Sequence, residues 1–261
     1  MTRDSYRGAA AGWARGATLV YAPIAALLVE QAPITLGGAH VLDVGAGTGV
    51  CEAPLRAAGA TLIVGADLSY DMLAWQRTTR APAIMCDVMR LPFADARFDA
   101  AIASFVLNHL TDPVRGLVEL ARTLRPGGAV LATVYANSSQ SSNRDTVDEI
   151  ARAHGWKPPS WYRELKTSAT PLLGGAPRMR TAATAAALID VHVREESVDV
   201  HVTEPEALVD YRFGQAHFAA WLAGLGPDER TAARLAATAA ITETMQPYRP
   251  RVVFLSARTA T

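Results

Sequence analysis

The chain has 261 residues, of which 50% are hydrophobic, and its 25 basic residues balance 25 acidic ones. This composition suits a globular chain with a sizeable core, and it disfavours nucleic acid as a substrate because binding the phosphate backbone needs clustered Lys and Arg. No apolar run of about 18 residues occurs, and residues 1–15 lack the apolar centre of a signal peptide, so we expect no transmembrane helix and a cytoplasmic location.

Residues 1–38 predict two helices. Residues 9–17 favour the first, and Pro23 suits the opening position of a second helix that reaches Gln31. Aromatic residues, among them Tyr21, occur here at irregular spacing. This segment therefore reads as helical rather than as part of a sheet.

Residues 41–50 read Val-Leu-Asp-Val-Gly-Ala-Gly-Thr-Gly-Val, a short apolar strand that runs into a glycine-rich turn. The glycines let the backbone approach a ligand closely, and a helix that begins near Thr48 would aim its free N–H groups at the same place. Asp43 would repel a pyrophosphate but suits a cationic or hydrogen-bond-donating ligand. The dinucleotide fingerprint would need glycine where Val50 stands, which leaves an NAD-dependent oxidoreductase as a minor alternative.

Two further strands also end in acids. The second strand, residues 62–67, ends at Asp67, where an acid of a doubly wound sheet faces the ribose of a bound nucleoside. Ser69 follows as the N-cap of a helix. The third element, residues 83–88, contains Asp87. Acids at strand ends are often plain turn residues, but acids after successive strands favour a ligand site.

The fourth strand covers residues 98–104 and leads to Asn108-His109. Asp112-Pro113 then opens an amphipathic helix, which Arg-Pro-Gly-Gly at 125–128 ends before a fifth strand over 129–135.

Beyond residue 136 the sequence predicts a cap over the sheet. Residues 137–143 form a polar turn and residues 145–154 a short helix, whereas residues 155–171 read as irregular and rich in tryptophan, tyrosine and proline. That aromatic segment could roof an apolar ligand or simply pack as a cluster.

The last part of the chain completes the sheet. A helix over 180–189 precedes strands over 191–202 and 251–257, and two helices over 204–222 and 227–243 are inserted between these strands. Cys51 and Cys86 lie in apolar runs without metal-ligand or Cys-x-x-Cys spacing. We interpret them as small buried residues and expect neither a metal site nor a redox pair.

The ordered motifs resemble those of class I S-adenosylmethionine-dependent methyltransferases that act on small molecules. The matching segments are Asp-Val-Gly-Ala-Gly-Thr-Gly at 43–49, Asp-Leu-Ser-Tyr-Asp-Met-Leu at 67–73, Asp87 with Leu-Pro-Phe at 91–93, Phe-Asp at 98–99 and Arg-Pro-Gly-Gly at 125–128. The resemblance implies an α/β fold with a Rossmann-like sheet in the order 3-2-1-4-5-7-6, strand seven antiparallel, and helical cap insertions. It divides the chain into an N-terminal lid (1–38), a cofactor-binding core (39–136), a cap insertion (137–175) and the rest of the sheet (176–261) with an inserted helical segment (203–246).

The same resemblance implies S-adenosyl-L-methionine as the cofactor and no metal. The residues that it assigns to the cofactor are Asp43, Gly45, Ala46, Gly47, Asp67, Leu68, Met72, Asp87, Val88 and Ser104. The N-terminal segment and the cap would supply the acceptor pocket, with Tyr21, Trp161, Tyr211 and His217 as candidates.

The methyl acceptor is expected to be a cyclic or aromatic small molecule of bacterial secondary metabolism, methylated at O, N or C. His109 follows strand four and, with the ordinary pKa of an imidazole, is the candidate general base. A pocket or packing role for His109 is the alternative. The chain is expected to be a monomer or homodimer without nucleic-acid or membrane partners, and a non-catalytic nucleoside-binding scaffold is the alternative function.

Overall fold

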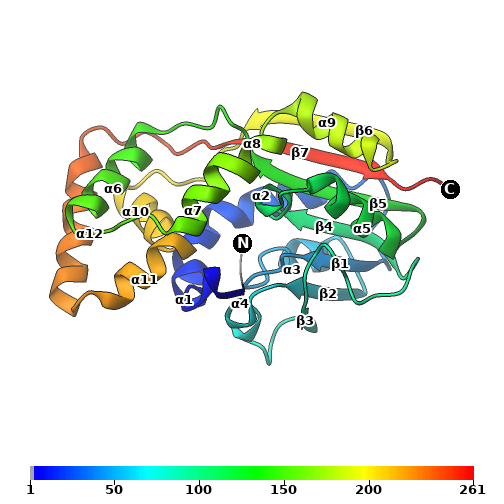
Figure 1. Ribbon diagram of the computed structural model, residues 1–261, viewed down its shortest axis with the longest axis horizontal. Coiled ribbons are helices and arrows are strands. Elements are labelled where there is room, and N and C mark those ends of the chain that lie inside the picture. The colour runs from blue at the N-terminus through cyan, green and yellow to red at the C-terminus, as the bar shows by residue number, and fades with distance from the viewer. Residues whose placement is uncertain (1–2) are drawn as a thin grey trace.

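A seven-stranded sheet forms the centre of the computed structural model, which describes residues 3–261 (Figure 1). Its strand order is β3-β2-β1-β4-β5-β7-β6. Strands β1 to β5 pair in parallel, and β7 pairs antiparallel with both β5 and β6. The predicted order and the antiparallel seventh strand are confirmed.

The strands are β1 (His40–Val44), β2 (Leu62–Asp67), β3 (Ala83–Met85), β4 (Phe98–Ser104), β5 (Leu124–Tyr135), β6 (Ile189–Ser197) and β7 (Arg251–Arg258). The helices before and between the first five strands are α1 (Ala10–Gly12), α2 (Thr18–Glu30), α3 (Glu52–Ala57), α4 (Tyr70–Ala74) and α5 (Pro113–Thr123). The remaining helices are α6 (Ser142–Ala153), α7 (Ser160–Glu164), α8 (Thr170–Leu173), α9 (Ala176–Ala185), α10 (Pro205–Phe213), α11 (Ala216–Gly224) and α12 (Pro227–Thr242).

Alternating residues of the central strands build a separate hydrophobic core on each face of the sheet. Val41 and Ile102 pack on one side with residues of α2 and α3, such as Leu28. Leu42 lies on the other side with α5 and α9. Because successive residues of a strand point to opposite faces, the apolar runs of β1 and β4 can bury both faces at once.

The N-terminal region forms one continuous helical segment, Ala10–Glu30, instead of the two helices predicted. A π-helical turn at Trp13–Ala17 joins α1 to α2, and Pro23 lies inside α2 rather than at its start. The prediction of a break was wrong because burial of the α2 face outweighs the cost of an internal proline, about 3 kcal/mol. By length and composition Ala10–Glu30 could cross a membrane, but Val20, Ile24 and Leu28 are fully buried in the core beside the sheet.

Several boundaries also differ from those predicted. The helix after the glycine loop begins at Glu52, not near Thr48, with Pro54 in its first turn. Most of residues 155–171, predicted as irregular, is helical, because α7 continues through a π-helical turn at Leu165–Ala169 into α8. Strand β5 already begins at Leu124, so the predicted turn at 125–128 belongs to an irregular start of that strand.

Helices α6, α10, α11 and α12 form a cap beside the sheet, and the N-terminal helix packs against them (Figure 1). The predicted helix over 204–222 is divided at Gly214, which lies against the backbone of the N-terminal helix. A Cβ at Gly16 would lie 1.9 Å from the Asp210 carbonyl oxygen, and one at Gly214 would lie 2.6 Å from that of Gly12. The N-terminal helix and α10 therefore touch backbone to backbone.

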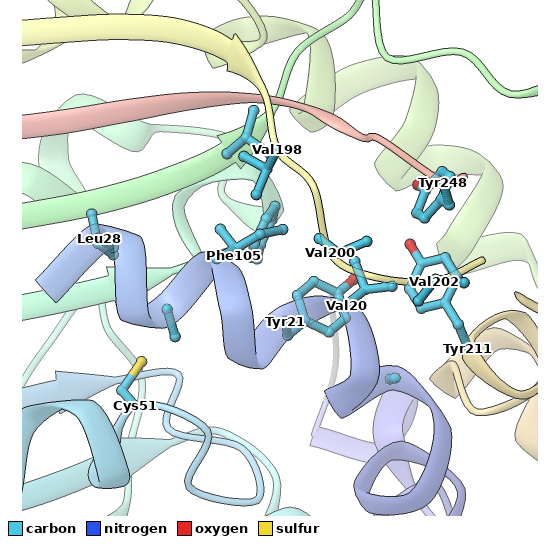
Figure 2. Packing of buried hydrophobic residues seen from close by; sticks show 14 of the residues in the cluster. Val20, Tyr21, Leu28, Cys51, Phe105, Val198, Val200, Val202, Tyr211 and Tyr248 are labelled. Atoms are coloured by element: carbon cyan, nitrogen blue, oxygen red, sulfur yellow. The ribbon is translucent and has the colours of Figure 1, made fainter. Parts of the chain in front are cut away.

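The packing between α2 and the cap is apolar and aromatic. Figure 2 shows Tyr21 of α2 beside Val200 and Val202 of the segment that follows β6, with Tyr211 of α10 close by. These residues belong to the same buried cluster as the α2 face of the sheet. The cap is therefore continuous with the main core.

Candidate active site

One cavity of about 760 Å³ lies where the loops after β1, β2, β4 and β5 meet the cap and the N-terminal segment. Its wall contains the glycine loop at one end and aromatic residues of the cap at the other. It is lined by every residue predicted for the site except Asp43: Gly45, Ala46, Gly47, Asp67, Leu68, Met72, Asp87, Val88, Ser104, His109, Tyr21, Trp161, Tyr211 and His217. Candidate residues that are far apart in the chain thus share one surface.

The Asp67 carboxylate organises the glycine-loop end of the cavity. It accepts a hydrogen bond from the Gly47 backbone N–H at 2.8 Å and another from the Ser69 N–H at 2.8 Å. Ser69 also caps α4, as predicted, by accepting from the Met72 N–H. Burial raises the pKa of Asp67, and the two backbone hydrogen bonds oppose that rise.

Asp43 lies behind the loop and does not line the cavity, so the structure does not support its predicted direct ligand contact. Its Oδ2 atom is buried without a hydrogen-bond partner, and burial raises the pKa of Asp43 to about 7. The alternation of β1 explains the placement, because Val44 faces the cavity and the preceding side chain must face the other way.

Arg80 holds the glycine loop from behind, which the sequence did not indicate. Its guanidinium donates to the Gly47 carbonyl oxygen at 2.7 Å and to Glu52 at 3.2 Å. Asp87 lines the cavity but is exposed, and it accepts from the Met89 N–H at 2.9 Å. The Asp87 carboxylate therefore stabilises the turn after β3, and its contact with a ligand stays a prediction.

His109 ends the short 3-10 turn Leu107–His109 after β4. Its Nε2 atom lies 3.4 Å from the Tyr6 hydroxyl, and its buried Nδ1 atom has no hydrogen-bond partner among residues 3–261. Burial lowers the pKa of His109 to about 4, below the ordinary imidazole value that the sequence led us to expect. At neutral pH the ring is uncharged and can accept a proton, but it is a weak base.

Aromatic rings form the wall between the sheet and the cap. Tyr21 stacks on Trp13 with ring centroids 4.9 Å apart and meets Phe105 edge-on at 4.8 Å. The hydroxyls of Tyr135 and Tyr211 lie 3.0 Å apart. The sequence interpretation missed Phe105, Tyr135 and their contacts, since Phe105 follows β4 and Tyr135 ends β5, two strands that read simply as buried. Phe105 has φ +57°, a conformation that a non-glycine residue keeps only when its surroundings hold it there.

The cap end of the cavity contains two buried polar side chains that the sequence did not single out as a pair. Arg212 donates to both carboxylate oxygens of Asp148, each at 2.8 Å, and to the side-chain oxygen of Gln215 at 2.7 Å. His217 stacks on Tyr162 with centroids 3.8 Å apart, and its Nε2 atom is buried without a partner. Burial and the nearby cation of Arg212 lower the pKa of His217. Trp161 lies at this end as well, with its ring 6.1 Å from that of Tyr6.

The comparisons with known proteins agree with this geometry. The family described as "Methyltransferase domain" matches residues 42–132. A demethylmenaquinone methyltransferase of Corynebacterium kroppenstedtii is 47% identical over 99 residues, which are 38% of this chain and 43% of that protein. The chain therefore spans less than half the length of the curated relatives it matches.

Two solved structures share the fold across nearly the whole chain. A Haloferax volcanii methyltransferase, solved in complex with the Trm112 methyltransferase activator, has a TM-score of 0.61 at 19% identity and covers 100% of this chain and 98% of that one. A Haemonchus contortus phosphoethanolamine N-methyltransferase, solved with S-adenosylhomocysteine, has a TM-score of 0.59 at 19% identity and covers 91% of this chain and 52% of that one. Residues 42–132 are thus similar to the methyltransferase-domain family, and the chain has the fold of the class I S-adenosylmethionine-dependent methyltransferases.

Proposed function

We propose that this chain is a methyltransferase that moves a methyl group from S-adenosyl-L-methionine to O, N or C of a compact cyclic or aromatic small molecule. The observation that carries the proposal is that one and the same cavity contains the glycine loop, Asp67 and an aromatic wall. A bound sulfonium supplies an activated methyl group. Alignment and exclusion of water then provide much of the acceleration.

The residues present fit the cofactor. The backbone at Gly47 leaves room beside the loop, since a Cβ there would meet the end of Met72 at 3.4 Å and the Gly45 carbonyl oxygen at 3.8 Å. Asp67 is the candidate acceptor for the ribose hydroxyls, and Leu68 with Met72 would flank the adenine. Asp87 and Val88 would meet the edge of that ring. Ser104 lies near the loop at the end of β4, where its hydroxyl is 3.2 Å from that of Thr133.

The aromatic rings that surround Tyr6 support a methyl acceptor of limited size. The Tyr6 ring lies 5.7 Å from that of Trp13, 6.1 Å from that of His109 and 6.1 Å from that of Trp161. Aromatic walls with a few polar groups suit a planar organic molecule. A role in secondary metabolism remains part of the proposal, and the relatives named as demethylmenaquinone methyltransferases make a quinol ring one acceptor to test.

Binding of S-adenosylhomocysteine tests the cofactor assignment. We expect the Asp67→Asn variant to bind it roughly ten- to a hundredfold more weakly by calorimetry, because charge-assisted hydrogen bonds are worth about 1.5–3 kcal/mol. The exposed Asp228→Asn is the matched control and should bind like the parent.

Two outcomes would contradict the proposed function. Thermal stabilisation by NAD but not by S-adenosylhomocysteine would favour an oxidoreductase. Cofactor binding without methyl transfer to any compound, in a mass-shift screen of phenols, quinols, amines and acids, would favour the nucleoside-binding scaffold.

A further inference from the structure

The described basic residues of the cavity wall are confined to its cap end, whereas acids occur at both ends. The acids Asp67 and Asp87 lie at the glycine-loop end. Among the described lining residues, the basic ones all belong to the cap and its connections: Arg144, Arg152, Lys166 and Arg212. Asp145 and Asp148 are the acids that accompany them. The cap end of the cavity therefore carries more positive than negative charge.

The charge of Arg212 is compensated within the protein by the Asp148 carboxylate. All its described partners are internal, namely the two oxygens of Asp148 and the side chain of Gln215. Its side chain is 4% exposed, and this buried ion pair holds α10 to α6. Because Asp148 pairs with Arg212, an uncompensated positive charge at this end of the cavity has to come from another residue.

Arg144, in the first turn of α6, has only weak partners. Its guanidinium lies 3.4 Å from the Ser139 carbonyl oxygen and 3.7 Å from a carboxylate oxygen of Asp145. The Asp145 side chain is 63% exposed, whereas that of Arg144 is 20% exposed. The ion pair between Arg144 and Asp145 is long, and solvent screens the exposed carboxylate. Most of the positive charge of Arg144 therefore remains uncompensated.

His217 supplies a second polar group at the same end. Its Nε2 atom is buried without a partner, although buried polar atoms in folded proteins nearly always have one. Arg212, Lys166 and Arg144 lie near enough to help hold the pKa of His217 low, after burial itself. The neutral ring can carry its proton on Nε2 and donate a hydrogen bond into the cavity.

We infer that the methyl acceptor carries an oxyanion group, a carboxylate or a phosphate, which binds at the cap end of the cavity against Arg144 with His217 as a second donor. A weakly paired arginine in a low-dielectric cavity favours an anionic oxygen pair, which its planar guanidinium can bind through two hydrogen bonds. The inference rests on the proposed function, because it names the chemistry of the acceptor of that same reaction.

The test measures binding of defined probes to the full chain saturated with S-adenosylhomocysteine. The probes are 2-hydroxybenzoate, 4-hydroxybenzoate and 1-hydroxy-2-naphthoate, the primary amide of each, and phenyl phosphate beside phenol. We expect at least one oxyanion probe to bind about tenfold or more tightly than its neutral partner, the scale of a charge-assisted hydrogen bond. Preference for phenyl phosphate alone would identify the oxyanion as a phosphate.

Three variants connect that preference to Arg144. Arg144→Gln should abolish it, and Arg144→Lys should restore part of it. Arg163→Gln should leave it intact, because Arg163 is an exposed residue of α7 that donates to Pro158 and does not line the cavity. Unchanged affinity for S-adenosylhomocysteine in all three variants would show that the fold is intact.

Two results would overturn the inference. One is equal binding of every oxyanion and its neutral partner, or binding of none, by a parent protein that still binds S-adenosylhomocysteine. The other is loss of S-adenosylhomocysteine affinity in Arg144→Gln with the acid preference retained, which would assign Arg144 to the carboxylate of the cofactor. A parent that fails to bind S-adenosylhomocysteine would instead contradict the proposed function.

Discussion

Gly45 and Gly47 show that two residues of one motif are constrained for different reasons. Both have positive φ, +67° and +51°, which an alanine adopts at a cost of about 1–2 kcal/mol. A Cβ at Gly45 would also lie 2.0 Å from Val106, whereas one at Gly47 would meet Met72 at an ordinary distance of 3.4 Å.

We therefore predict that Gly45→Ala destabilises the fold more than Gly47→Ala. Overpacking against Val106 should add about 1–3 kcal/mol to the backbone term. Urea unfolding of both variants measures the difference in the free energy of unfolding. Equal losses would mean that the loop after β4 moves away from Gly45 without cost.

His109 gives a pH prediction whose direction follows from its burial. A general base must be unprotonated, and a pKa of about 4 keeps the imidazole neutral far below the usual histidine range. We expect kcat/KM to hold its plateau on the acid side past pH 6.5 and to fall only as the pH approaches 4. A fall centred near pH 6.5 would contradict the buried placement of the ring.

Substitution of His109 separates catalysis from packing. If His109 is the base, His109→Ala should lower kcat by roughly 10²–10⁴ and leave the affinity for S-adenosylhomocysteine nearly unchanged. His109→Asn keeps a polar side chain of similar reach. An Asn variant within about threefold of the parent rate would assign His109 to the pocket wall.

At the scale of elements, the ion pair between Asp148 of α6 and Arg212 of α10 holds the cap together. Their side chains are 13% and 4% exposed, so loss of the carboxylate leaves a buried guanidinium without its counter-charge. We predict that Asp148→Asn lowers the free energy of unfolding by about 3–5 kcal/mol, measured by urea denaturation.

An exposed pair provides the control for that measurement. Asp190 lies 3.6 Å from Arg258, and the two side chains are 54% and 33% exposed. Asp190→Asn should change the free energy of unfolding by less than about 1 kcal/mol. A loss for Asp148→Asn no larger than for this control would mean that the cap does not depend on its buried pair.

Elements were predictable from the sequence where local signals agreed with the tertiary packing. The bounds of β4 were predicted to the residue, and Ser69 and Asp112 cap their helices as expected. Local sequence rules failed where packing against distant parts of the chain determined the secondary structure. Pro23 lies inside a helix because the face around it is buried, and α7 to α8 form helices in a segment whose prolines suggested a loop.

At the scale of the whole molecule, the sheet order followed from the resemblance, while the partners of individual side chains did not. The glycine loop and Asp67 could be assigned because motif residues lie close together in the chain. Arg80 and Arg212 could not, since their acidic partners lie 28 and 64 positions away and no local pattern marks such pairs. Asp43 does not line the cavity, since the alternation of side chains along β1 sets where each of them points and the motif alone does not reveal it.

The backbone contact of Gly16 and Gly214 with neighbouring helices determines which part of the chain can open the cavity. Since the helix from Ala10 onward is clamped to α10, it cannot swing away without carrying the cap with it. Gly8 stands just before this clamp with φ +71° and open space around its Cα, and its N–H is tied to Asp71 at 2.9 Å. The N-terminal helix and α10 therefore form one packing unit, so a substitution that enlarges Gly16 or Gly214 would disturb the cap as well as the helix.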